Sequence, residues 1–254
     1  MKESIFLGKI IEIAEEAGEV LLKFQKNVRE LKKNRKDFLT DADFKSDKLV
    51  GARLKSVASQ IPIFSEENGE HSINKGKIWV VDPLDGTVNF FHQDSLWGVS
   101  IALVENRKTK LGVVCLPALN QTIGVYENEI IVKGNVSLGV RKDSRLAEAQ
   151  IWTDWGKESE VVLSLLPKLK KISLYPQIRL CATASLMAVA NGKICAYIHP
   201  HPAPEDFAAA ALIVEKVGGK VTDLNNDPWD VFSSSIIASN GILHEQILEG
   251  IGSI

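Results

Sequence analysis

Two aspartates directly follow a short apolar run in the first half of the chain. Trp79-Val80-Val81 leads into Asp82-Pro83-Leu84-Asp85, and Gly86-Thr87 comes immediately after. Pro83 has no N–H and is expected to end the ladder pairing of this strand. Carboxylates three residues apart at the end of a strand can converge on Mg²⁺, which prefers hard anionic oxygen ligands. Backbone N–H groups at the start of a following helix can hold a phosphate. The stretch therefore predicts a metal ion and an anion side by side.

Asp82 and Asp85 could instead cap a helix or close a turn, as most Asp-Pro and Asp-Gly pairs do. Two other acidic positions favour the metal interpretation. Glu66 follows the apolar run of residues 61–64, and Asp206 opens an alanine-rich helical pattern. Acidic residues at the ends of three separate elements fit a multi-metal site better than three unrelated caps.

These motifs together resemble the inositol monophosphatase family of metal-dependent, lithium-sensitive phosphatases, and the resemblance covers nearly the whole chain. The residues that carry it are Glu66-Glu67, Asp82-Pro83-Leu84-Asp85-Gly86-Thr87 with Asn89-Phe90 after it, and Asp206-Phe207-Ala208-Ala209 followed by Gly218-Gly219. The family binds two or three Mg²⁺ ions per site. The resemblance implies that Glu66, Asp82 and the carbonyl of Leu84 hold one ion, and that Asp82, Asp85 and Asp206 hold a second.

The resemblance also assigns catalytic roles. Glu66 and the hydroxyl of Thr87 would orient and deprotonate the attacking water, and Asp82 would bridge the two metals. Paired metals about 3.5–4 Å apart stabilise the attacking and leaving oxygens of an in-line displacement. The N–H groups of Gly86 and Thr87 would bind phosphoryl oxygens. No covalent phosphoenzyme is needed.

Further substrate-binding and metal-binding candidates come from the same resemblance. Arg179 and Ala182 lie in a stretch similar to the substrate-lining Arg-x-x-Gly-Ser/Thr-Ala segment of the family, and Asp85 and Asp206 would also face the substrate. Thr40-Asp41-Ala42-Asp43 resembles the family's entry to its second helix, where a loop helps to hold a further metal. Asp41 and Asp43 are second-rank candidates, and the pattern favours Asp43 as a helix cap over a direct ligand.

His199 stands where inositol-preferring relatives usually carry a glutamate that binds substrate hydroxyls. Its segment, His199-Pro200-His201-Pro202, is also typical of an extended surface loop with the two histidines on opposite sides. If His199 reaches the site, a partly cationic imidazole should favour a substrate with a second anionic group, and less so as pH rises through about 6.5. Glu205 and Ala210 replace the usual tryptophan and glycine beside the helix aspartate, and we expect them to reshape the leaving-group pocket.

Hydrophobic periodicity predicts the elements that position these residues. Helical spacing predicts helices ending near residue 26 and spanning 44–60, with a basic, polar segment at 29–37 expected as a solvated loop. Strands are expected at 61–65, 78–81, 97–104, 111–116 and 122–126, and short polar turns between the last three imply antiparallel pairing of those strands. Later elements are a strand near 151, helices at 158–169 and 184–191, a strand at 193–198, a helix from 206 to 217, strands at 220–222 and 235–238, and a helix at 243–248.

This order predicts an antiparallel-sheet first half (residues 1–138) and an α/β second half (residues 139–254). We treat the two halves as one domain. The resemblance implies the layered α/β/α/β sandwich of the sugar phosphatases, which propensity alone could not have fixed.

The bulk composition excludes several other classes. The formal net charge of −2 provides no general basic field for nucleic acid or an anionic membrane. No apolar run reaches the ~20 residues of a membrane span, and the N-terminus lacks a signal-peptide pattern. Cys115, Cys181 and Cys195 are odd in number and lack metal-ligand spacing, so buried free thiols in a reducing, cytoplasmic setting are expected.

The sequence thus predicts a Mg²⁺-dependent phosphomonoesterase for a small polyol or sugar phosphate. Alternative substrates within the family are fructose 1,6-bisphosphate, histidinol phosphate, NADP and 3'-phosphoadenosine phosphates. An alternative of another class is a catalytically weak regulator that binds RNA polymerase or another protein. Homodimers are usual in the family.

Overall fold

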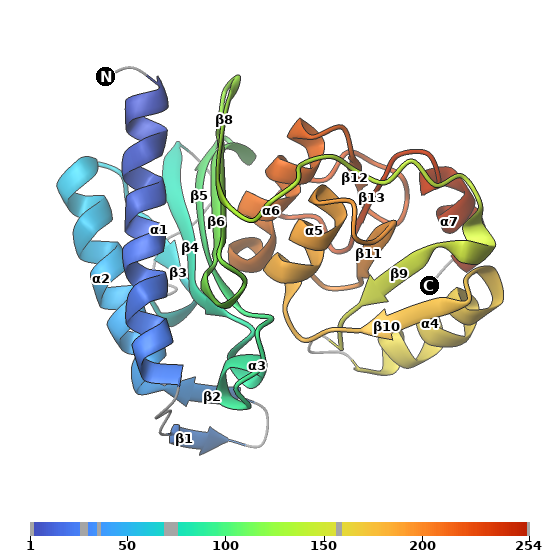
Figure 1. Cartoon of the computed structure of the whole chain (residues 1–254), viewed down its shortest axis with the longest axis horizontal. Coiled ribbons are helices and arrows are strands. Elements are labelled where there is room, and N and C mark those ends of the chain that lie inside the picture. The colour runs from blue at the N-terminus through green and yellow to red at the C-terminus, as the bar shows by residue number, and fades with distance from the viewer. Residues whose placement is uncertain (1–2, 26–29, 35–36, 69–75, 156–158, 253–254) are drawn as a thin grey trace.

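The computed structural model describes residues 3–25, 30–34, 37–68, 76–155 and 159–252, which form β-sheets layered between helices (Figure 1). A six-stranded sheet has the order β3-β4-β5-β6-β7-β8. Its strands are β3 Ile63–Ser65, β4 Lys77–Asp85, β5 Gly98–Glu105, β6 Lys108–Leu116, β7 Gln121–Tyr126 and β8 Glu129–Gly134. β3 and β4 are parallel, and every later pair in the order is antiparallel, as their short connections require.

Helices α1 (Glu3–Gln25) and α2 (Asp41–Val57) cover the outer face of this sheet. Along β4, Trp79 and Val81 face these two helices, whereas Ile78 and Val80 face the opposite way. Side chains alternate along a strand, so a continuous apolar run means that both faces of the sheet are buried. This places the end of β4 deep inside the protein.

A second, five-stranded sheet has the order β10-β9-β11-β13-β12. Its strands are β9 Gln150–Thr153, β10 Tyr175–Ile178, β11 Ala196–His199, β12 Lys220–Thr222 and β13 Ile236–Ser239. β9 pairs in parallel with β10 and β11, whereas β13 pairs antiparallel with β11 and β12. The second half is therefore a mixed α/β structure, as expected.

Two helices, α5 (Ala182–Ala190) and α6 (Pro204–Lys216), lie between the sheets. Every residue of α5 is buried. The backbone of α6 approaches the first sheet closely at Ala209, where a Cβ on Gly112 would come within 2.6 Å of the Ala209 carbonyl oxygen. Gly112 on β6 and Ala209 on α6 are small enough to allow this close approach. The contact brings the start of α6 to the first sheet.

Helices α4 (Ser159–Ile172) and α7 (His244–Ile251) cover the remaining face of the second sheet. The layers are thus helices, sheet, helices, sheet and helices, which confirms the layered sandwich and adds an outer helical layer. Among the described residues, no helix combines the length and apolar composition needed to cross a membrane.

The structure corrects several expected elements. Within the polar segment at 29–37, β1 (Glu30–Asn34) pairs antiparallel with β2 (Asp37–Thr40), although residues 29, 35 and 36 lie outside the described residues. β1 has four polar or charged residues among its five, and β2 has only four residues, so an analysis based on hydrophobicity did not identify these strands. β8 and β10 were missed because each has exposed residues and lies at the edge of a sheet. Short helical turns η1 Glu66–Asn68, η2 Pro117–Leu119 and η3 Leu146–Glu148 were also unexpected.

Candidate active site

Strand β4 does not stop at Asp82, although Pro83 was expected to end its pairing. Asp82 lies opposite Ser100 and Asp85 opposite Gly98, with an irregular register between the two pairs. Such an irregularity tolerates a proline, because the residue without an N–H lies where the ladder is already interrupted. Ser46 of α2 donates to the Pro83 carbonyl at 2.8 Å, and Leu84 N–H donates to Asp82 Oδ1 at 2.9 Å. The irregular segment of residues 82–85 is therefore held by a hydrogen bond from α2 and by one within the segment itself.

Helix α3 (Thr87–Phe91) starts directly behind this irregular segment. Its N-cap is Gly86, with φ at 83° and no side-chain cap, so neither Asp82 nor Asp85 caps the helix. A Cβ on Gly86 would lie 2.8 Å from the Leu96 carbonyl oxygen, so glycine is needed for space as well as for its left-handed backbone. The Thr87 hydroxyl donates to the Leu84 carbonyl oxygen at 3.1 Å.

Three aspartates from distant parts of the chain meet at this end of β4. Asp82, Asp85 and Asp206 each offer an oxygen, and these atoms all lie within 4.8 Å of one another. Asp82 and Asp85 are buried, and Asp206 is partly buried in the first turn of α6. The Thr183 hydroxyl donates to the Asp206 carbonyl oxygen at 3.2 Å, which ties the start of α6 to α5. We call these three side chains the aspartate cluster.

The start of α5 holds Asp85 in place. Thr183 N–H donates to Asp85 Oδ2 at 2.6 Å, and the sulfur of Cys181 lies 3.1 Å from the same oxygen. Burial raises the pKa of Asp85, and these hydrogen bonds, together with one from the Ala182 N–H, oppose the rise. Sequence reasoning missed Cys181 and Thr183 as supports of Asp85, although a cysteine and a threonine before an alanine-rich helix are consistent with a helix N-terminus.

Glu66 reaches the site from η1, directly behind β3. Glu66 as a whole residue is exposed, but loss of solvent around its carboxylate, followed by the charges of Glu205, Glu67, Asp85 and Asp43, raises its pKa from 4.5 to about 7. The pKa of Glu67 is likewise raised to about 7 by burial and by nearby aspartates. The acidic region therefore extends from the aspartate cluster to Glu66 and the first turns of α2 and α6.

The electrostatics of the aspartate cluster fit a cation site. Burial raises the pKa of Asp82 and Asp206 well above the ordinary value, and the charges that raise them further are all carboxylates, including Glu66. Burying like charges together is unfavourable unless protons or cations compensate. Clustered carboxylate oxygens are ligands that suit Mg²⁺.

The second-rank residues Asp41 and Asp43 belong to the first turn of α2, which begins at Asp41 rather than near residue 44. Asp43 is therefore not the cap that we had considered. It is buried, and its charge raises the pKa of Glu66 and Glu67, so it lies on the Glu66 side of the site. Asp41 is partly exposed, and its role in metal binding stays a prediction.

Arg179 and Ala182 flank Cys181 in the segment that leads into α5. The Arg179 guanidinium lies over the ring of Trp152 at 4.9 Å and donates to Gln177 Oε1 at 2.7 Å. Ala182 is buried at the first position of α5. Substrate contact by either residue remains a prediction.

His199 is not part of a surface loop, contrary to one expectation. It ends β11, is 6% exposed, and lies 5.1 Å from the ring of Phe207 in α6. His201 N–H donates to its Nδ1 at 3.2 Å. Burial, with a smaller effect of His201, lowers the pKa of His199 to about 4. This lowered pKa contradicts the expectation of a partly cationic His199 near pH 7. Substrate contact by His199 and a preference for doubly anionic substrates stay predictions.

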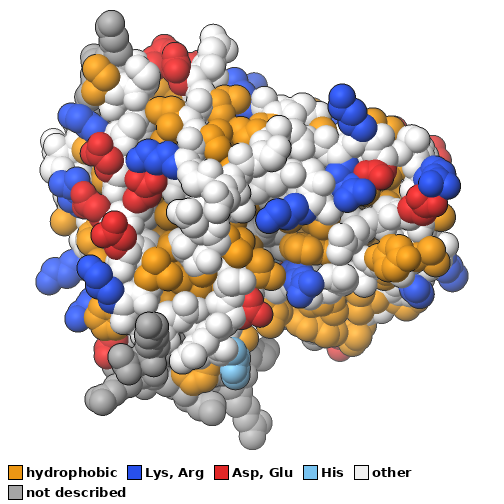
Figure 2. All heavy atoms as spheres, viewed as in Figure 1, with side chains coloured by type: hydrophobic (Ala, Val, Ile, Leu, Met, Phe, Trp, Pro, Cys, Tyr) orange, Lys and Arg blue, Asp and Glu red, His pale blue; other side chains and the backbone are white. Residues whose placement is uncertain are grey.

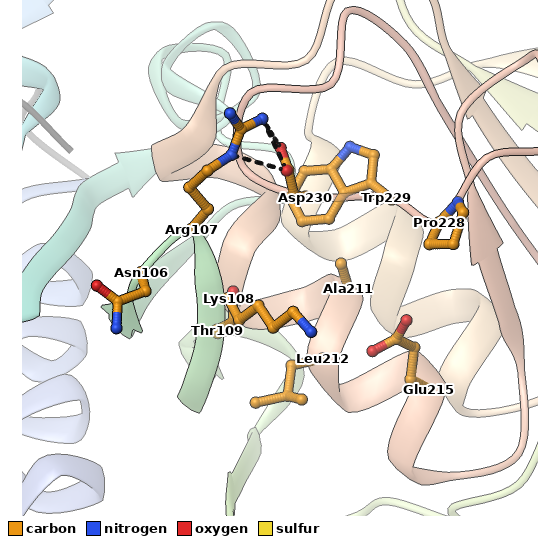
Figure 3. A pocket seen from close by; sticks show the side chains of 10 residues that line it. All are labelled: Asn106, Arg107, Lys108, Thr109, Ala211, Leu212, Glu215, Pro228, Trp229 and Asp230. Atoms are coloured by element: carbon orange, nitrogen blue, oxygen red, sulfur yellow. Dashed lines mark hydrogen bonds and ion pairs between the residues drawn. The ribbon is translucent and has the colours of Figure 1, made fainter. Parts of the chain in front are cut away.

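A separate cavity of about 530 Å³ lies at the other end of β5, between the β5–β6 turn and α6 (Figure 3). Arg107 at its rim is paired with Asp230 and stacks on Phe232. Figure 2 shows basic and acidic side chains interspersed on one face, without a basic stripe. The aspartate cluster is the arrangement of described residues that best combines burial with metal-ligand chemistry.

Comparison with known proteins shows which family this chain belongs to. Residues 6–254 match the Inositol monophosphatase family. A Thermotoga maritima protein named fructose-1,6-bisphosphatase/inositol-1-monophosphatase is 29% identical over 86% of this chain and 84% of its own length. Human inositol monophosphatase 1 is 30% identical, covering 95% of this chain and 92% of its own. The solved structure of a Thermotoga maritima IMPase superposes with a TM-score of 0.85 at 27% identity, covering 95% and 94% of the two chains. The chain belongs to the inositol monophosphatase family of phosphoric monoester hydrolases.

Proposed function

We propose that this chain is a Mg²⁺-dependent phosphatase that hydrolyses the phosphomonoester of a small polyol or sugar. The meeting of Asp82, Asp85 and Asp206 within 4.8 Å supports the proposal most directly. With Glu66 and the carbonyl of Leu84, these residues would hold two or three Mg²⁺ ions. Bound Mg²⁺ would neutralise phosphoryl oxygens and lower the pKa of a water molecule.

The proposal gives residues of this chain specific roles in the reaction. The Thr87 hydroxyl donates its proton to the Leu84 carbonyl, so its oxygen lone pairs can accept a hydrogen from the attacking water. A Glu66 carboxylate oxygen would take the other proton as the water oxygen attacks phosphorus. The N–H groups of Gly86 and Thr87 would bind the phosphoryl oxygens. Cleavage of the ester P–O bond then leaves inorganic phosphate and releases the alkoxide, which takes a proton from a solvent water molecule to become the alcohol.

Thr87→Ala tests the water-orienting role. We expect kcat to fall by about 10–100-fold with little change in KM, because orientation of the nucleophile matters mainly in the transition state. Thr87→Ser keeps the hydroxyl and should retain most of the activity. Steady-state kinetics of both variants at saturating Mg²⁺ provide the measurement. If only KM changes in Thr87→Ala, Thr87 binds substrate and does not orient the water.

Phosphate release from a panel of metabolites, with and without Mg²⁺, tests the function itself. The panel should contain inositol 1-phosphate, fructose 1,6-bisphosphate, histidinol phosphate, NADP and 3'-phosphoadenosine phosphates. Fructose 1,6-bisphosphate is a specific second candidate, because a relative named for both activities is 29% identical. We expect Mg²⁺-dependent release from at least one of these substrates. A folded protein inactive on the whole panel would favour the regulatory alternative.

Lithium should inhibit the reaction, as the resemblance to the lithium-sensitive family implies. The charge and ligand set of Asp82, Asp85 and Asp206 would let Li⁺ compete for one of the Mg²⁺ positions after turnover. Phosphate release measured at millimolar Li⁺ and limiting Mg²⁺ should decrease, and added Mg²⁺ should restore it. Unchanged rates at high millimolar Li⁺ would mean that this site is built differently.

We further propose that the enzyme works in the cytoplasm as a homodimer. Cys115, Cys181 and Cys195 are free and buried, which suits a reducing compartment. Light scattering coupled to size-exclusion chromatography measures the oligomeric state, and a mass near 27.9 kDa would contradict the dimer.

A further inference from the structure

The thiol of Cys181 lies between the start of α5 and the carboxylate of Asp85. The side chain is 1% exposed, and its sulfur accepts a hydrogen bond from Ala184 N–H at 3.3 Å as the N-cap of α5. The same sulfur lies 3.1 Å from Asp85 Oδ2. An ionised carboxylate can only accept hydrogen bonds, so the thiol must be the donor in this contact.

Two neighbouring contacts fix the position of this thiol. Gly86 makes room for it, because a Cβ on Gly86 would lie 3.0 Å from Cys181 Cβ. Asn89 of α3 donates to the Leu180 carbonyl oxygen at 3.1 Å, which anchors the residue before Cys181. The turn that carries Asp85 and the segment that carries Cys181 are therefore held against each other.

We infer that Cys181 is a positioning residue for the metal site, which orients Asp85 through its S–H hydrogen bond to Oδ2. Thr183 N–H donates to the same oxygen at 2.6 Å and Ala182 N–H also donates to Asp85, so the thiol is one of several donors at one helix start that fix the orientation of the carboxylate. Asp85 is thereby presented to a cation together with Asp82 and Asp206. This inference rests on the proposed function, because it assigns the aspartate cluster to a divalent cation.

The size of the effect follows from outer-shell partners in other metal sites, whose loss typically weakens metal binding by about 10–100-fold. The thiol is a weak donor, and Thr183 remains, so a change of about tenfold is expected. Cys181→Val is similar in volume but cannot donate to Asp85. Cys181→Ser keeps a donor for Asp85 and an acceptor for Ala184 N–H.

Calorimetric titration of the metal-free protein with Mg²⁺ tests the inference. We expect Cys181→Val to raise the Kd for Mg²⁺ about tenfold, and Cys181→Ser to stay within about threefold of wild type. Cys195→Val is the matched control, since Cys195 is equally buried but belongs to the core beneath α4 and α7. Thermal unfolding without Mg²⁺ reports separately any loss of the α5 cap.

The outcomes separate this inference from the proposed function. Unchanged Mg²⁺ affinity in a folded Cys181→Val variant would overturn the positioning role while leaving the function intact. A Cys181→Ser variant as weak as Cys181→Val would also overturn it, because hydrogen bonding would then not be the cause. Wild-type protein that binds no Mg²⁺ would reject both proposals. Wild-type binding without hydrolysis of any ester would reject only the function.

Discussion

Replacing Asp82 with asparagine should lower Mg²⁺-dependent phosphate release by more than about 100-fold, because the loss of a direct ligand should exceed that of an outer-shell partner. A neutral amide cannot bridge two dications as a carboxylate does. The fold should survive, since asparagine has nearly the same shape and its Oδ1 can still accept from Leu84 N–H. Phosphate release and circular dichroism of the purified variant provide the measurement.

The same substitution should stabilise the metal-free protein. Asp82 is buried beside Glu66, Asp206 and Asp85, and its raised pKa records the cost of that charge. Removing the charge should raise Tm without Mg²⁺, by roughly 2–4 °C for each kcal/mol gained in a domain of about this size. Asp227→Asn at an exposed position is the control and should change neither property. Near-wild-type activity of Asp82→Asn would contradict the metal assignment.

Stabilisation of the protein by Mg²⁺ should increase as pH rises from about 5 to 8. In the metal-free protein, the pKa of Glu66 is raised from 4.5 to about 7, and the pKa values of Asp82, Asp85 and Asp206 are raised too. Between the unfolded and folded values, the native state binds more protons, so the free energy of unfolding falls with rising pH. Mg²⁺ binds the deprotonated carboxylates, so the protein with bound Mg²⁺ does not lose this stability as pH rises.

Differential scanning fluorimetry with and without Mg²⁺, across this pH range, measures the effect. Each tenfold gain in apparent Mg²⁺ affinity adds about 1.4 kcal/mol of stabilisation once the ion is in excess. His199 and His244 have pKa values lowered to about 4, so they change the stability in the opposite direction between pH 4 and 6.5. The difference between the two curves therefore isolates the carboxylates.

Glu66→Gln is the informative variant for this dependence. In this variant the stabilisation by Mg²⁺ should rise less steeply with pH than in wild type. The change should be partial, because Glu66 is exposed enough for solvent to screen its charge. A Mg²⁺ effect that stays constant from pH 5 to 8, or that is absent, would contradict the view that cations and protons compete for this site.

The aspartate cluster could be predicted because each member lies at the end of an element. Asp82 follows an apolar strand, and Asp206 starts an alanine-rich helix, so sequence patterns place both at layer boundaries. The resemblance to the family then predicted that these residues lie close together, which hydrophobic periodicity alone could not predict. The individual buried strands and helices were predictable because they are strongly patterned, but their arrangement in layers was expected from the family resemblance alone.

The supports of the site could not be predicted, because they depend on contacts between distant segments. Cys181 and Asp85 are 96 residues apart, and only the packed layers bring them together. His199 was misjudged because its proline-rich segment is typical of a loop, whereas pairing of β11 with β13 buries it. Pro83 was expected to end β4, but the register irregularity lets Asp85 continue the strand.

Anomalous diffraction from crystals grown with Mn²⁺ tests the central claim most directly, because Mn²⁺ accepts the same oxygen ligands as Mg²⁺. Our account predicts at least two anomalous peaks at the end of β4, with Asp82 contacting both and Asp85, Asp206 and Glu66 contacting one or the other. Crystals that show Mn²⁺ elsewhere on the protein but none at the aspartate cluster would contradict it.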